Sequence, residues 1–172
     1  MTRKIIKVTE KDKQFAKEQI EAFEKTQHGK WRYSDVEAWR GIVCEILTSR
    51  WFEERFNVEK PAKGLDTSGI IDDCDLIIDG KKIEIKSATR NYFKYIMPKI
   101  YDITNKPKDM YIGVKYNETV EPNEVEIIGS ITRQNIMKYP IKQNKGAPYY
   151  EIPLNDLTPI NIPETGGLDE YC

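Results

Sequence analysis

Apolar and polar positions alternate along two short runs within residues 74–86, which meet at Asp79-Gly80. Alternation predicts strands, because successive side chains of a strand point to opposite faces of a sheet. Asp-Gly between two such runs predicts a two-residue hairpin turn, since both turn positions need a positive φ angle. The turn sets the register, so we expect Asp75 to lie directly opposite Glu84.

The two faces of this hairpin differ in character. The apolar face carries Cys74, Leu76, Ile78, Ile83 and Ile85. The polar face carries Asp73, Asp75, Lys82, Glu84 and Lys86, with Ile77 among them. We therefore expect one face to pack on a core and the other to hold opposed carboxylates with a lysine beside them.

Hydrophobic spacing predicts further elements on both sides of the hairpin. Helices are expected at residues 10–25 and from Ser34 to about Phe56, the second opened by a capping box from Ser34 to Glu37, with shorter ones at 100–104 (or a loop there) and 132–139. Strands are expected at residues 58–60 or 69–71, 91–97 (with a helix as the alternative), 110–116, 125–130 and 149–152. This pattern predicts an α/β fold, with a mixed central β-sheet flanked by helices and the 74–86 hairpin at its centre.

Length and composition narrow the class of protein. The chain has 172 residues, of which 32% are charged and 39% hydrophobic, and its net charge is −1. A single domain is expected, with an N-terminal helical extension (1–33), a core (34–131) and a C-terminal helix and tail (132–172). No apolar run approaches membrane-spanning length, and three irregularly spaced cysteines suggest neither a disulfide framework nor a zinc site. We therefore expect a cytoplasmic protein without membrane association.

Asp75 and Glu84 are the first candidate site residues. Like charges placed directly opposite each other destabilise a sheet, and a divalent cation such as Mg²⁺, which takes carboxylate oxygens as ligands, removes the conflict. Lys86 lies two residues from Glu84 on the same face, where it can stabilise charge developing on a phosphate. The alternative is a solvated outer face, on which Lys82 and Lys86 neutralise the acids.

These residues carry a resemblance. Asp75, followed on the next strand by Glu84-Ile85-Lys86, resembles the core of the PD-(D/E)xK nuclease superfamily, although a cysteine, Cys74, stands where the motif has proline. The resemblance implies a restriction-endonuclease-like core, with Mg²⁺ held by Asp75, Glu84 and the backbone carbonyl of Ile85. It also implies that Lys86 assists the attacking water.

Glu45 is the fourth candidate. It shares a line of the long predicted helix with three small residues, Ala38, Gly41 and Ser49, which would let the helix approach a sheet closely. The resemblance implies that a glutamate on this helix joins the metal site, and Glu45 is the residue that we assign. The alternative is a boundary residue paired with a lysine or arginine.

Together these observations predict a metal-dependent nuclease that hydrolyses phosphodiester bonds. We expect Mg²⁺ as the cofactor with Mn²⁺ as a substitute, DNA as the substrate, and endonuclease rather than exonuclease action; a homodimer is left open. Basic residues available to line a groove are Arg90, Lys94, Lys99, Lys106, Lys108, Lys115, Arg133, Lys138, Lys142 and Lys145. The alternatives are a non-catalytic nucleic-acid-binding or assembly module with the same fold, and a structural protein with a solvated hairpin face.

Overall fold

The computed structural model describes residues 4–25, 37–65 and 73–161 of the chain. Two predictions concern residues outside these ranges: the capping serine Ser34 and the alternative strand at 69–71.

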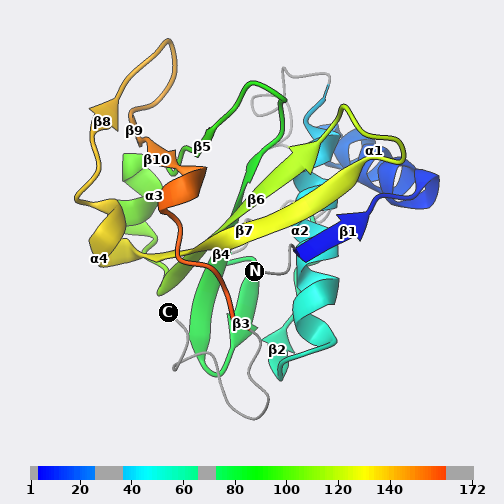
Figure 1. Cartoon of the computed structure of the whole chain (residues 1–172), viewed down its shortest axis with the longest axis horizontal. Coiled ribbons are helices and arrows are strands. Elements are labelled where there is room, and N and C mark those ends of the chain that lie inside the picture. The colour runs from blue at the N-terminus through cyan, green and yellow to red at the C-terminus, as the bar shows by residue number, and fades with distance from the viewer. Residues whose placement is uncertain (1–3, 26–36, 66–72, 162–172) are drawn as a thin grey trace.

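A six-stranded mixed sheet forms the centre of the molecule (Figure 1). Its strands, in spatial order, are β1 (Lys4–Lys7), β7 (Glu124–Thr132), β6 (Met110–Asn117), β4 (Lys81–Ala88), β3 (Leu76–Ile78) and β2 (Val58–Lys60). β4 and β6 run parallel, and the other neighbouring pairs are antiparallel. β6 and β4 are therefore the two central strands, and the β3–β4 hairpin reaches from the centre toward the β2 edge instead of forming the centre itself.

Helices and short strands cover the two faces of this sheet. On one face lie α1 (Glu10–Glu24) and α2 (Trp39–Glu53), whose buried side chains share a core with the apolar face of the hairpin. A second core on the opposite face is built from the C-terminal third of the chain and the segment after β4 (Figure 1). The elements that contribute to it beside the sheet are β5 (Tyr95–Ile96), α3 (Ile100–Asn105), α4 (Arg133–Ile136), β9 (Tyr149–Tyr150), β10 (Ile152–Pro153) and the 3₁₀ turn η2 (Leu154–Asp156). The short strand β8 (Ile141–Lys142), which pairs with β9, is exposed. The predicted α/β fold with a mixed sheet flanked by helices is confirmed.

The hairpin has the register that its turn predicts. Leu76 pairs with Ile83, Ile77 with Lys82 and Ile78 with Lys81. The turn residues Asp79 and Gly80 have φ angles of 49° and 74°, as a primed turn requires. The apolar face is buried as expected, with Leu76, Ile78 and Ile83 fully inaccessible to solvent.

The start of α2 differs from the prediction. The helix begins at Trp39, and its N-cap residue, Ala38, makes no side-chain capping bond. Glu37, assigned to the capping box, lies outside the helix and pairs with Arg40 at 3.1 Å. The helix therefore begins later than expected, and the capping box, which includes Ser34 outside the described residues, stays a prediction.

Two segments adopt structures that local pattern did not indicate. Residues 91–97 form a strand only at Tyr95–Ile96, which pairs with β10 and not with the main sheet. The preceding residues are a loop because their carbonyls bind the Lys115 ammonium instead of a neighbouring strand. Lys4–Lys7, expected within a helical extension, is a strand that pairs with β7.

Candidate active site

A cavity of about 290 Å³ opens where the hairpin meets α2. It is lined by Ala38, Gly41, Ile42, Glu45, Leu65, Asp75, Glu84, Ile85, Lys86 and Ser87. All four candidate side chains, and the backbone position assigned to the metal, therefore line one cavity. The structure places them there from three separate elements: α2, the residue before β3, and β4.

The cavity lies at a step in the sheet edge. Within the described residues, β3 pairs with β4 only as far as Ile83, while β4 continues through Ala88. Asp75 stands at this step. Its backbone N–H donates to the carbonyl of Ile83 at 3.1 Å, and its Oδ2 accepts the backbone N–H of Ile85 at 2.7 Å. The side chain of Asp75 therefore accepts the next N–H of β4 beyond the point where the pairing of β3 with β4 ends.

The same arrangement points the backbone of Ile85 into the site. In a strand, the N–H and C=O of one residue face the same neighbour. Because the N–H of Ile85 points to Asp75, its carbonyl also faces the cavity side of β4, which is the side that the metal assignment requires.

Glu84 and Lys86 form an ion pair at the cavity. Lys86 Nζ lies 2.7 Å from Glu84 Oε1, and the side chains of Lys86 and Glu84 remain 24% and 20% exposed. On the parallel neighbour β6, Glu84 is aligned with Tyr111 and Lys86 with Gly113. A side chain at position 113 would collide with Leu157, so this glycine lets the C-terminal segment pack beside Lys86.

Glu45 reaches the site from α2. Its Oε1 accepts the backbone N–H of Gly64 at 3.1 Å. Gly64 has a φ angle of 76°, and a Cβ atom there would lie 2.1 Å from Gln19 Oε1. A glycine is therefore required at the residue that positions Glu45. Of the small residues on the predicted line, Ala38 and Gly41 line the cavity, whereas Ser49 accepts the N–H of Ala62 elsewhere.

The carboxyl groups of the site perturb one another. Burial, and then repulsion from Glu84, raises the pKa of Asp75 to about 7. Burial, followed by the nearby Asp75, raises the pKa of Glu45 well above its usual value. Burial acts to lower the pKa of Lys86, but its ion pair with Glu84 outweighs that effect, so the pKa is raised and the ammonium stays charged.

The carboxylates of Asp75, Glu84 and Glu45 line this cavity, and carboxylate oxygens suit a hard cation such as Mg²⁺. Asp75 and Glu84, with Glu45 and the Ile85 carbonyl, would hold the ion, and the proximity of like charges is a conflict that a divalent ion relieves. Within the described ranges, no three His, Cys, Asp or Glu side chains are grouped closely enough to form a metal site by themselves. A bound ion would therefore need waters or substrate oxygens to complete its shell, as is usual for Mg²⁺.

Sequence reasoning missed Gly64, Leu65 and Ser87 as parts of the site. The only sequence signal for Gly64 was its place in a turn-rich connection, which gave no indication of contact with Glu45. Several of the basic residues expected in a groove have other partners: Lys108 Nζ binds the carbonyl of Lys106, and Arg133 Nε donates to that of Ile103 at 2.8 Å.

Comparison with models of known protein families and with curated proteins finds no match to this chain. In the part of the chain that the structure describes, no helix has both the length and the apolar character needed to cross a membrane.

Proposed function

We propose that the chain is a Mg²⁺-dependent nuclease with a restriction-endonuclease-like core, which hydrolyses phosphodiester bonds in DNA. The observation that carries the proposal is the convergence of Asp75, Glu84, Lys86 and Glu45 on one cavity at the step in the sheet edge. A mixed sheet with helices on both faces supports the proposed core.

In such a site, the carboxylates and the lysine of this chain would have different roles. A bound Mg²⁺, which Mn²⁺ could replace, would polarise the phosphate and supply an activated water. Asp75 and Glu84 provide the carboxylates, and Glu45 adds a third whose position is set by Gly64. Lys86 places a charged ammonium beside Glu84, where it stabilises negative charge on the attacked phosphate.

Asp75 has a structural function as well as a proposed chemical one. Its Oδ2 holds the N–H of Ile85, which fixes the strand position from which Glu84 and Lys86 project. A carboxylate accepts several bonds, so this contact leaves the group able to bind a cation. The geometry of the site therefore does not depend on the ion alone.

The test compares DNA cleavage by the wild type, Lys86→Ala and Lys82→Ala in Mg²⁺ and in EDTA. Lys82 is the matched control, because it lies on the same strand and face but is exposed and pairs with Asp73. Wild type and Lys82→Ala should cut in Mg²⁺, whereas Lys86→Ala should lose on the order of 100-fold or more in rate. Circular and linear duplexes and single strands serve as substrates, and cutting of the circle identifies an endonuclease.

If the purified wild type cuts none of these substrates with Mg²⁺ or Mn²⁺, the proposal fails. The non-catalytic nucleic-acid-binding module is then the better account. Equal cleavage by wild type and Lys86→Ala would instead place any nuclease activity outside this cavity.

A further inference from the structure

The loop between β4 and β5, residues 89–94, presents exposed aromatic surface; it is called the aromatic loop below. The side chain of Tyr92 is 70% exposed, the largest fraction among the exposed large hydrophobic residues of the described chain. Its ring packs against Phe93 edge to face, with ring centroids 4.8 Å apart. Phe93 in turn contacts Tyr95, with centroids 6.4 Å apart. Three neighbouring rings therefore form one small cluster with Tyr92 at its outer end.

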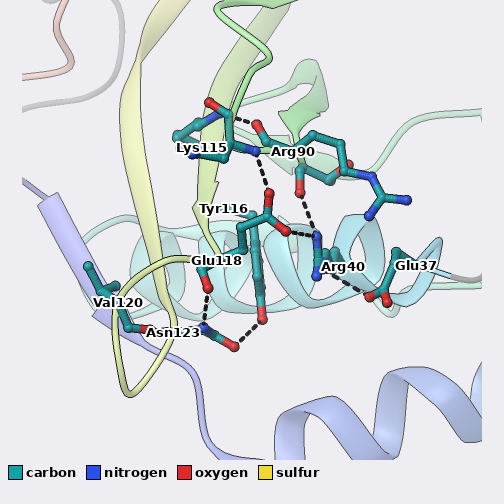
Figure 2. Close-up of polar contacts among 10 residues, drawn as sticks. Glu37, Arg40, Arg90, Lys115, Tyr116, Glu118, Val120 and Asn123 are labelled. Carbon is teal, nitrogen blue, oxygen red and sulfur yellow. Dashed lines mark hydrogen bonds and ion pairs between the residues drawn. The ribbon is translucent and has the colours of Figure 1, made fainter.

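Lys115, on β6, holds the backbone of this loop. Only 9% of Lys115 is exposed, and its Nζ contacts the carbonyl oxygen of Arg90 (Figure 2). The same Nζ contacts the carbonyl oxygens of Asn91 at 3.3 Å and of Phe93 at 2.7 Å. An ammonium group has three hydrogens to donate. The bonding capacity of this buried group is thus directed at the main chain of the aromatic loop.

Arg40 and Glu118 hold the loop from the side of α2, as Figure 2 shows. Glu118 Oε1 accepts the N–H of Asn91 at 2.6 Å, and its Oε2 lies 2.5 Å from Arg40. Arg40 also donates to the carbonyl of Thr89 at 3.3 Å. The loop is therefore anchored on two sides before any partner binds, which lowers the entropic cost of ordering it on binding.

The charge of the loop and its flanking residues suits a polyanion, and Glu118, whose carboxylate contacts the loop, is paired with Arg40. From Ser87 to Tyr101 the sequence contains Arg90, Lys94 and Lys99 and no acidic residue, although the whole chain has a net charge of −1. Ser87 lines the catalytic cavity, and the loop begins two residues later. Basic and aromatic residues are thus interleaved directly after the strand that carries Glu84 and Lys86, the combination with which proteins bind single-stranded nucleic acid.

We propose that the aromatic loop is a stacking platform for an unpaired base of single-stranded nucleic acid, next to the cavity. Tyr92 supplies the ring face, and the basic side chains contact the phosphates. In an intact duplex the base faces are already stacked, so the platform favours single strands, tails or unpaired junctions. This inference rests on the proposed function, because it names the substrate class for that same site.

The test measures binding without cleavage. Fluorescence anisotropy in EDTA follows a labelled single-stranded DNA, an RNA of the same sequence and a blunt duplex. A second reporter, a 2-aminopurine base within the DNA, changes its emission when it stacks on a ring. The variants are Tyr92→Leu, which removes the ring but keeps an apolar side chain, and Tyr92→Phe, which keeps the ring. Phe15→Ala is the matched control, because Phe15 is an exposed aromatic residue on α1, away from the loop.

We expect Tyr92→Leu to weaken single-strand binding about 5- to 150-fold and to abolish the 2-aminopurine signal. Tyr92→Phe and Phe15→Ala should bind as the wild type does, and the duplex should bind more weakly than either single strand. The DNA and RNA arms show which single strand is preferred.

Unchanged single-strand binding by Tyr92→Leu, or equal loss in Phe15→Ala, would overturn the inference. The two proposals fail separately. Tyr92-dependent binding without any cleavage would retain the platform and reject the nuclease, whereas cleavage of duplex with no effect of Tyr92→Leu on binding would do the reverse.

Discussion

Asp75 Oδ2 accepts the backbone N–H of Ile85 at 2.7 Å, so one carboxylate both extends the β3–β4 hydrogen bonding and lines the cavity. Substitutions at Asp75 therefore have two consequences that can be separated. A variant that keeps an accepting oxygen affects only the charge, and a variant that removes it also leaves a buried N–H without its partner.

Asp75→Asn should retain the fold and lose the response to Mg²⁺. The amide oxygen of asparagine can still accept the N–H of Ile85, while the charge needed by the cation is gone. Thermal unfolding with and without Mg²⁺ measures this: the Tm of the wild type should rise with the ion, and the Tm of the variant should not. Asp75→Ala should in addition lower the metal-free stability by about 1–3 kcal/mol. Equal Mg²⁺ responses in wild type and Asp75→Asn would remove Asp75 from the metal site.

The stability of the metal-free protein should fall as pH rises toward 7. The pKa of Asp75 is raised from 3.8 to about 7 in the folded state, so the folded protein keeps a proton that the unfolded chain releases between these values. Each such proton contributes a slope of up to about 1.4 kcal/mol per pH unit, and the loss is complete above the folded pKa. Glu45, whose pKa is also raised, acts in the same direction.

Denaturant unfolding in EDTA at a series of pH values tests this, with Asp75→Asn as the reference. From about pH 4 to pH 7, the unfolding free energy of the wild type should fall relative to that of the variant. A difference that does not change over that range would contradict the raised pKa of Asp75.

Glu45→Gln should weaken Mg²⁺ binding and leave the fold intact. The glutamine oxygen can still accept the N–H of Gly64, so the loop keeps its anchor while the third carboxylate is neutralised. Titration calorimetry with Mg²⁺ gives the affinity, and Glu53→Gln, an exposed position on the same helix, is the control. If both variants bind the ion as the wild type does, Glu45 is a structural residue only.

Gly64→Ala should destabilise the protein and disturb the site together. The φ angle of 76° costs an alanine about 1–2 kcal/mol, and its Cβ atom would displace Gln19, which accepts the N–H of Leu65. A shift of the backbone at residue 64 would also move the N–H that holds Glu45, and should therefore reduce the Mg²⁺ affinity. Unfolding and calorimetric measurements on this variant should therefore both shift, whereas Gly80→Ala, whose Cβ would meet no atom, should change stability alone.

The hairpin was predictable because its information is local. Asp79-Gly80 fixes the turn, the turn fixes the register that pairs Leu76 with Ile83, and Asp75 and Glu84 line one cavity. The long strands β6 and β7 were likewise visible as sustained apolar runs. The place of Glu45 followed from a resemblance and a line of small residues, and the structure puts it at the same cavity.

Other features depend on contacts between distant positions. The aromatic run at 91–97 has strand-like composition, but Lys115 takes the carbonyls that a strand would have used. Residues Lys4–Lys7 become a strand because they pair with the free edge of β7. The sequence of these four residues alone does not predict that pairing. The importance of Gly64 depends on a contact with Glu45 across 19 positions of sequence.

The hydrogen bonds that anchor the aromatic loop go to its main-chain atoms. Lys115, Arg40 and Glu118 contact carbonyls and an N–H within residues 89–93, and these atoms are present whichever side chains the loop carries. These contacts therefore do not depend on the identity of the loop's side chains. Substitutions at Tyr92 and its neighbours should therefore leave these backbone contacts in place, which makes the loop a suitable position for grafting other side chains.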